Sequence, residues 1–113
     1  MSLEKLAKLS NKYGSDSNFV LAGGGNTSYK DDKYLYIKGS GTTLATIKPE
    51  DFVAMDRAKL GAMWEKQYSA DTNEREKEVL ADLMAAKVDP ASGRPSVETS
   101  LHDLMPFTYV VHL

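Results

Sequence analysis

The apolar residues near the start of the chain recur every three or four positions, which is the spacing of one helical face. This spacing predicts a helix over residues 2–13, and Gly14 is placed to end it. A second stretch of this kind, residues 71–88, predicts a helix with Asp71 and Glu74 as its capping pair. The apolar positions on the two faces are Leu3, Leu6, Leu9, Tyr13, Val79, Leu80, Leu83 and Met84.

Short apolar and β-branched runs predict strands between these helices and at the end of the chain. Residues 27–30 and 34–38 predict a hairpin around a polar turn at residues 31–33. Further strands are predicted over residues 19–22, 52–56 and 108–113.

Three shorter segments complete the pattern. Pro49 predicts one helical turn, and residues 57–67 are ambiguous because Gly61 weakens a helix there. Ser96 is a natural N-cap for a helix that ends before Pro106. Helices and strands mix throughout, so the fold class is α/β or α+β, and the hairpin indicates antiparallel pairing.

Length and composition describe one ordinary soluble domain, or a part of one. The 113 residues are 42% hydrophobic and 27% charged, with a formal charge of -2. This balance gives no general attraction to nucleic acid or to an anionic membrane, and no apolar run is long enough to span a bilayer. Cysteine is absent, so metal ligands must come from His, Asp or Glu, and a cytoplasmic location is expected.

Two loops of small residues follow predicted strands, namely Gly23–Ser28 and Gly39–Thr43. Glycines let a ligand approach the backbone closely, and the amides and hydroxyls of these loops can bind phosphate or hydroxyl oxygens. Neither loop has the spacing of a nucleotide-binding motif, and a tight strand connection explains each of them equally well or better. Two such loops in one short chain favour a shared anionic group, to which Lys38 can add charge.

An acid and two histidines are the candidates for chemistry. Glu98 lies where the last helix should begin, although an acid at that position also adds about 0.3–1 kcal/mol to helix stability. His102 lies four residues later on the same helical face, where a packed histidine is more common than a ligand. His112 ends an apolar run, but a single histidine cannot hold catalytic zinc, which needs three protein ligands and an open position. An acid near a metal-holding histidine is the minimum equipment for metal-assisted carbanion chemistry.

Five segments, in order, resemble the class II aldolase/adducin N-terminal family of zinc-dependent sugar-phosphate aldolases and their relatives. The resemblance covers most of the chain and is closest to the branch of rhamnulose-1-phosphate aldolase domains, which are often fused to a short-chain dehydrogenase. It implies a three-layer αβα fold around a largely antiparallel sheet, with residues 1–113 as the N-terminal portion of a domain that is incomplete at its C-terminus. The segments are GGGNTS (Gly23–Ser28), YLYIKGSGT (Tyr34–Thr42), IKPEDFVAMD (Ile47–Asp56), RPSVETSLH (Arg94–His102) and VVHL (Val110–Leu113).

The resemblance also implies roles for individual residues. Glu98 matches the catalytic acid/base, and His112 matches the first histidine of a zinc-binding His-x-His pair whose second member would be residue 114. A third, distant zinc histidine is also expected outside these residues. Val97 differs from the serine that sugar-phosphate aldolases often have at this position. The residues that match phosphate-binding positions are Gly25, Asn26, Ser40, Gly41 and Ser96.

The activity implied by the resemblance is retro-aldol cleavage of a ketose phosphate by a zinc enzyme. The 113 residues alone are expected to bind zinc weakly and to show no turnover. The family commonly assembles as a homotetramer, so a homo-oligomer is expected. Three alternatives stay open: a family epimerase or dehydratase, a non-catalytic adducin-like assembly module and, least favoured, nucleotide binding through the first glycine loop.

Overall fold

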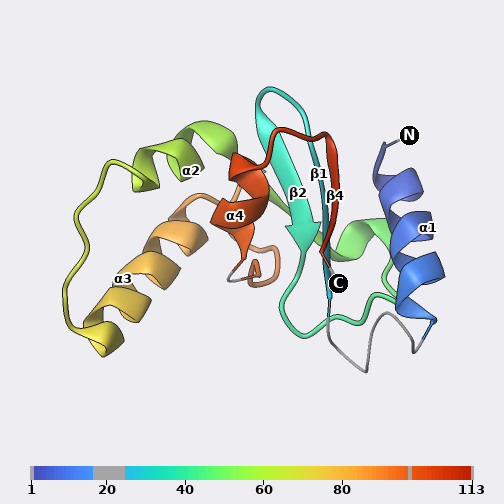
Figure 1. Ribbon diagram of the computed structural model, residues 1–113, viewed down its shortest axis with the longest axis horizontal. Helices are drawn as coiled ribbons and strands as arrows, with labels where there is room; N and C mark the ends of the chain where they lie inside the picture. Colours follow the sequence, from blue (N-terminus) through green and yellow to red (C-terminus); the bar gives the residue numbers. More distant parts are fainter. Residues whose placement is uncertain (1, 17–24, 97, 113) are drawn as a thin grey trace.

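A four-stranded sheet lies between two helical layers in the computed structural model, which describes residues 2–16, 25–96 and 98–112. Helix α1 covers one face of the sheet, and α2, α3 and α4 lie on the other side (Figure 1). This arrangement confirms the predicted three-layer αβα fold. The elements are α1 (Ser2–Gly14), β1 (Asn26–Lys30), β2 (Tyr34–Lys38), the 3-10 turn η1 (Pro49–Asp51), β3 (Phe52–Asp56), α2 (Arg57–Met63), α3 (Thr72–Ala85), α4 (Thr99–Leu104) and β4 (Tyr109–His112).

The sheet has the strand order β3-β2-β1-β4, and every neighbouring pair is antiparallel. The predicted hairpin is confirmed as β1 and β2, with Ser28 opposite Ile37. The last strand returns to pair with the first, which places His112 opposite Asn26. Residues that are far apart in the sequence therefore meet at the start of β1 (Figure 1).

Each face of the sheet has its own apolar cluster. Alternating residues of β2 and β3 face α2 and α3, because side chains two positions apart share a face of a strand. The members of this larger cluster are Leu35, Ile37, Val53, Met55, Leu60, Met63, Leu83 and Ala86. The smaller cluster packs α1 against the opposite face and contains Leu6, Ala7, Ile47 and Phe52.

Several predicted elements are confirmed, and one helix ends earlier than expected. The N-terminal helix, the turn at Pro49 and strand 52–56 are present as predicted. The helix predicted over 71–88 stops at Ala85, because the next residues pair with β3 through the Val88 amide and the Ala54 carbonyl. Within the part of the chain with described positions, no helix is long and apolar enough to cross a membrane. The strand predicted over 19–22 and the glycines at 23 and 24 lie outside the described residues.

The last helix begins later than the sequence predicts. Helix α4 starts at Thr99, and Glu98 occupies its N-cap position, so Ser96 is not the N-cap. The reason lies in the preceding segment, where the Ser40 amide donates to the Arg94 carbonyl at 2.7 Å and Gly39 bridges Pro95. This pairing holds the chain extended up to Pro95. The Glu98 carboxylate makes no capping hydrogen bond and instead contacts Asn26 and His112.

Candidate metal and anion site

The face of β1 that looks toward α4 is polar although it is buried. Asn26, Ser28 and Lys30 share this face, and each is at most 6% exposed. Buried polar groups are destabilising unless they have hydrogen-bond partners, and here the partners come mainly from residues 96–102. Asn26 donates to the Ser96 and Glu98 side chains, and Lys30 donates to the His102 carbonyl at 2.8 Å.

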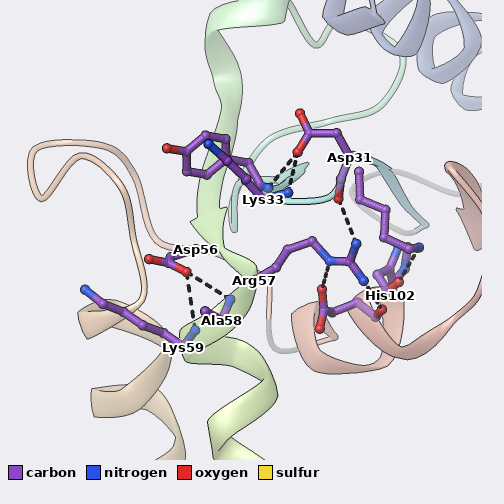
Figure 2. A network of polar contacts seen from close by, with 10 residues as sticks. Asp31, Lys33, Asp56, Arg57, Ala58, Lys59 and His102 are labelled. Carbon is purple, nitrogen blue, oxygen red and sulfur yellow. Dashed lines mark hydrogen bonds and ion pairs between the residues drawn. The ribbon is translucent and has the colours of Figure 1, made fainter.

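Helix α4 is held in place over β1 by charged contacts. The Arg57 guanidinium donates to the Asp103 carboxylate at 2.6 Å and to the Asp31 carbonyl at 2.7 Å. Arg57 thus reaches from the start of α2 toward both the β1–β2 turn and α4, the helix that carries His102 (Figure 2). Asp103 is 9% exposed, so Arg57 is the oppositely charged partner of a nearly buried side chain. These contacts, with the Lys30 bond, fix the position of His102.

Glu98 lies at the centre of the site. Its Oε1 accepts from the Asn26 amide at 3.1 Å, and its Oε2 lies 3.1 Å from Nδ1 of His112. The Glu98 side chain is 38% exposed and that of His112 is 43% exposed, so both can be reached from solvent. The structure therefore brings together the two residues that the sequence singled out for acid/base and metal chemistry.

The sequence did not decide whether His102 packs in the core or binds a metal. His102 is fully buried, and its Nδ1 lies 2.6 Å from the Ser28 hydroxyl. Burial lowers the pKa of His102 to about 4, so the ring is neutral near pH 7. The four-residue spacing from Glu98 was the available signal, but only the packing of α4 on β1 shows where the ring points.

Glu98, His102 and His112 form a cluster of possible metal ligands. One ligand atom from each of the three lies within 4.8 Å of the other two. Nε2 of His102 and Nδ1 of His112 are both buried and have no hydrogen-bond partner. His112 is at ion-pair distance from Glu98, but the two are not aligned as a hydrogen bond. Unsatisfied buried nitrogens of this kind are what a metal site needs, because a ligand nitrogen must offer a free lone pair.

The predicted phosphate-binding residues are only partly brought together. Asn26 and Ser96 are in contact, with the Asn26 amide donating to the Ser96 hydroxyl at 2.5 Å. Gly25 precedes Asn26 directly and has φ 80°, a conformation that favours glycine. Ser40 and Gly41 are exposed and make no hydrogen bond to Asn26 or Ser96 in the described structure. Their loop is nevertheless fastened to the segment before Ser96 through Arg94.

Lys38 lies near this site, as the sequence suggested when it placed Lys38 next to the second glycine loop. It is 6% exposed, and its ammonium group has no hydrogen bond or ion pair to any described residue. The two other buried lysines among the described residues differ, because Lys30 bonds the His102 carbonyl and Lys87 bonds carbonyls of residues 90–93. Burial lowers the pKa of Lys38, and the nearby Glu98 carboxylate partly offsets this effect. Lys38 is thus a largely buried lysine near Glu98 that forms no ion pair with another described residue.

Comparison with known proteins shows the family of the chain and a solved structure of similar fold. The family described as Class II Aldolase and Adducin N-terminal domain matches residues 4–113. The chain belongs to this family. A solved structure of the N-terminal class II aldolase domain of a conserved protein from Thermoplasma acidophilum has a TM-score of 0.85 and 29% sequence identity, over 99% of this chain and 54% of that one.

A curated relative is also similar over almost the whole chain. The uncharacterized oxidoreductase YuxG of Bacillus subtilis is 31% identical over 119 residues, which cover 97% of this chain and 16% of that protein. The chain therefore spans about half of the matched structure and a small part of the curated relative.

Proposed function

We propose that this domain is the N-terminal part of a zinc-dependent aldolase that cleaves a ketose phosphate, of the rhamnulose 1-phosphate type, by retro-aldol chemistry. The observation that carries the proposal is the position of Glu98 between Asn26 and His112. A carboxylate between these two residues would lie next to a substrate bound at Asn26. It would also lie next to a metal ion bound at His112, and therefore near the substrate carbon that must receive a proton. Membership of the class II aldolase family supports the same kind of chemistry.

Glu98 is the proposed acid/base. Its Oε1 is oriented by the Asn26 amide, so the carboxylate is positioned before substrate arrives. In retro-aldol cleavage the hydroxyl group on the departing carbon loses its proton to a base and becomes the carbonyl of the aldehyde product. The electron pair of the broken carbon–carbon bond stays on the other carbon, which must then receive a proton. We assign the transfer of that proton to Glu98, because acid/base catalysis requires a group within hydrogen-bond reach of the reacting atom.

His112 is the residue proposed to hold the zinc ion, with Glu98 beside it. The residues present fit a divalent metal, because Nδ1 of His112 is buried without a hydrogen-bond partner and lies 3.1 Å from a carboxylate. When bound, zinc supplies a Lewis acid for the carbonyl and neighbouring hydroxyl of the ketose.

The phosphate is proposed to bind where Asn26, Ser96 and Lys38 lie. The Ser96 hydroxyl oxygen accepts from the Asn26 side chain and from the Glu98 amide, so its own proton is left to donate to an anion. Lys38 would neutralise the charge, since it has no anionic partner among the described residues. Gly25, Ser40 and Gly41 complete the proposed set, with glycines allowing close approach of the backbone.

The test is a cleavage assay with rhamnulose 1-phosphate on a longer form of the protein that includes the segment after residue 113. Glu98→Gln should lower kcat by about 10²–10⁴-fold with little change in KM, because it removes a proton transfer and preserves the shape of the site. Lys38→Met should mainly raise KM, because it removes charge from the ground-state complex. Lys66→Met, at an exposed lysine, is the control and should leave both constants unchanged.

Unchanged turnover in Glu98→Gln would contradict the proposal and favour a role in assembly.

A homo-oligomer is proposed as well. Leu104 and Phe107 are 62% and 64% exposed, and β4 forms one edge of the described sheet. An exposed strand edge beside apolar side chains favours association with another chain. A cytoplasmic location is part of the same proposal.

A further inference from the structure

Lys87 is a buried lysine whose ammonium group binds carbonyl oxygens of the main chain. The residue is 7% exposed, and its Nζ donates to the carbonyls of Ser92 at 2.7 Å, Pro90 at 3.2 Å and Gly93 at 3.4 Å. An ammonium group carries a full charge and three donors, so it suits three carbonyl oxygens and binds them more strongly than a neutral donor would. The proposed aldolase chemistry does not use this lysine.

The segment that Lys87 binds, residues 89–94, has no buried residue of its own. All six residues are exposed except Ser92, which is half-buried. The carboxylate and carbonyl of Asp89 accept hydrogen bonds from the Ala91 amide and from the Ser92 amide and hydroxyl, so the first part of the segment forms a local turn. The rest of the segment depends on contacts with other parts of the chain, and the ammonium group of Lys87 is one of them.

The backbone at Lys87 is itself fixed to strand β3. Lys87 forms an isolated bridge with Met55, and the Val88 amide donates to the Ala54 carbonyl at 2.9 Å. Met55 belongs to the larger apolar cluster, where it is fully buried, so this part of the chain has a fixed position. The side chain of Lys87 therefore ties an exposed segment to the core of the domain.

The end of the same segment leads directly into the candidate site. On its way from α3 to α4 the chain passes the end of β2 (Figure 1). There the Arg94 carbonyl accepts from the Ser40 amide at 2.7 Å. The buried Pro95 forms a bridge with Gly39, and Ser96 is the next residue. The path of the segment thus decides where Ser96 and the start of α4 lie.

We propose that Lys87 is a positioning residue, whose ammonium group holds residues 89–94 in the path that sets Ser96 and Glu98 against β1. This inference rests on the proposed function, because Ser96 and Glu98 are the groups proposed to bind phosphate and to move a proton. A displacement of about 1 Å at such groups can lower a rate about 100-fold, even when the substitution lies far from the chemistry. Loss of the charge at Lys87 should therefore impair a site that it does not touch.

The first experiment is amide hydrogen exchange followed by NMR on this chain, because it needs no activity. The Ser40 amide should be protected by its bond to the Arg94 carbonyl. Lys87→Met keeps a long side chain without the charge, and we expect it to remove this protection while amides inside β2 keep theirs. Lys59→Met is the matched control and should change nothing, since Lys59 is exposed and donates to the Ala85 carbonyl at 3.5 Å.

The second experiment is the cleavage assay on the longer form of the protein. Lys87→Met should lower kcat/KM about 100-fold, and KM should rise as kcat falls, because both the phosphate contact and the acid/base move. A variant that is only less stable contains fewer active molecules, which lowers kcat and leaves KM unchanged. Thermal unfolding measures the folded fraction, and Lys59→Met should leave both constants unchanged.

A rescue experiment covers the case in which Lys87→Met does not fold. In Lys87→Ala, added propylammonium supplies the atoms that the substitution removes, and it should restore protection of the Ser40 amide and raise kcat/KM. Propanol has the same carbon chain without the charge and should do neither. Equal Ser40 protection with and without propylammonium would contradict the inference.

The outcomes separate this inference from the proposed function. Unchanged Ser40 protection in folded Lys87→Met would overturn the inference, as would a fall in kcat at constant KM that follows the folded fraction alone. Absence of rhamnulose 1-phosphate cleavage by the unmodified longer form would defeat the proposed function. Exchange at Ser40 would still decide whether Lys87 sets the path of residues 89–94.

Discussion

Strands β1 and β2 lie side by side and bury the same face of the sheet, but they bury opposite kinds of side chain. On β2 this face carries Leu35 and Ile37, which pack in the apolar cluster with α2 and α3. On β1 it carries Ser28 and Lys30, directly opposite those two residues in the antiparallel register. All four are at most 6% exposed. One sheet face is therefore divided between a core and a site.

The difference shows how a small domain can bury a polar site. Apolar burial on β2 needs only matching shapes and contributes roughly 1.5–3 kcal/mol for each large side chain. Polar burial on β1 contributes little by itself and needs a specific partner for each atom. Helix α4 supplies these partners to Ser28 and Lys30. Two described buried nitrogens without a hydrogen-bond partner, Nε2 of His102 and Nδ1 of His112, lie in or beside this polar half.

The largest effect should come from the apolar half. Ile37→Ala should lower the free energy of unfolding by about 2–5 kcal/mol, because it leaves a cavity at a fully buried position. Ser28→Ala, opposite it on β1, should cost less, about 1–3 kcal/mol, mainly by leaving Nδ1 of His102 without a partner. Urea unfolding of the two variants without metal measures both. A larger loss in Ser28→Ala than in Ile37→Ala would contradict the division into core and site.

The second-largest effect should come from low pH, which should lower the free energy of unfolding through the buried His102. The pKa of His102 is about 4 in the folded chain and 6.5 when unfolded, so the unfolded chain takes up the proton first as the pH falls. Stability from this group is therefore fully present above pH 6.5 and declines by about 3 kcal/mol on going down to pH 4. The measurement is the free energy of unfolding against pH in a chelator. His102→Asn should flatten this part of the curve, and an unchanged slope would show that the ring is not buried as a neutral group.

The smallest predicted effect concerns the contact that holds α4 over β1. Arg57→Met should lower the free energy of unfolding by about 1–2 kcal/mol, because Asp103 is nearly buried and loses its partner. The matched control is Lys66→Met, whose ion pair with Asp82 is more exposed, at 55% and 24%, and should cost less than about 1 kcal/mol. Equal losses in the two variants, measured by thermal unfolding, would show that burial of Asp103 does not matter.

Much of the fold was predictable because each element has a local signature. Spacing of apolar residues indicated α1, and alternation with a polar turn indicated the β1–β2 hairpin. The start of α4 was predicted wrongly, since the pairing of Gly39 with Pro95 joins two segments that are distant in the sequence. No local pattern records such a contact.

The candidate site shows the same limit. Glu98 and His112 were singled out from the sequence, and the structure places them 3.1 Å apart. His102 was left between a packing role and a ligand role, because four-residue spacing describes a helix face without saying what lies against it. Nothing in the sequence indicated that Lys38 is buried. The structure shows that it is, without an ion pair to another described residue.

The amino-acid sequence by itself determined which segments form helices and strands, and it predicted Glu98 and His112 as the residues for acid/base and metal chemistry. Only the tertiary structure decided that Asn26, Glu98, His102 and His112 converge. The physical reason is that secondary structure follows from contacts between near neighbours in the chain. The site instead depends on β4 pairing with β1 and on α4 packing across them, which brings together residues more than 70 positions apart.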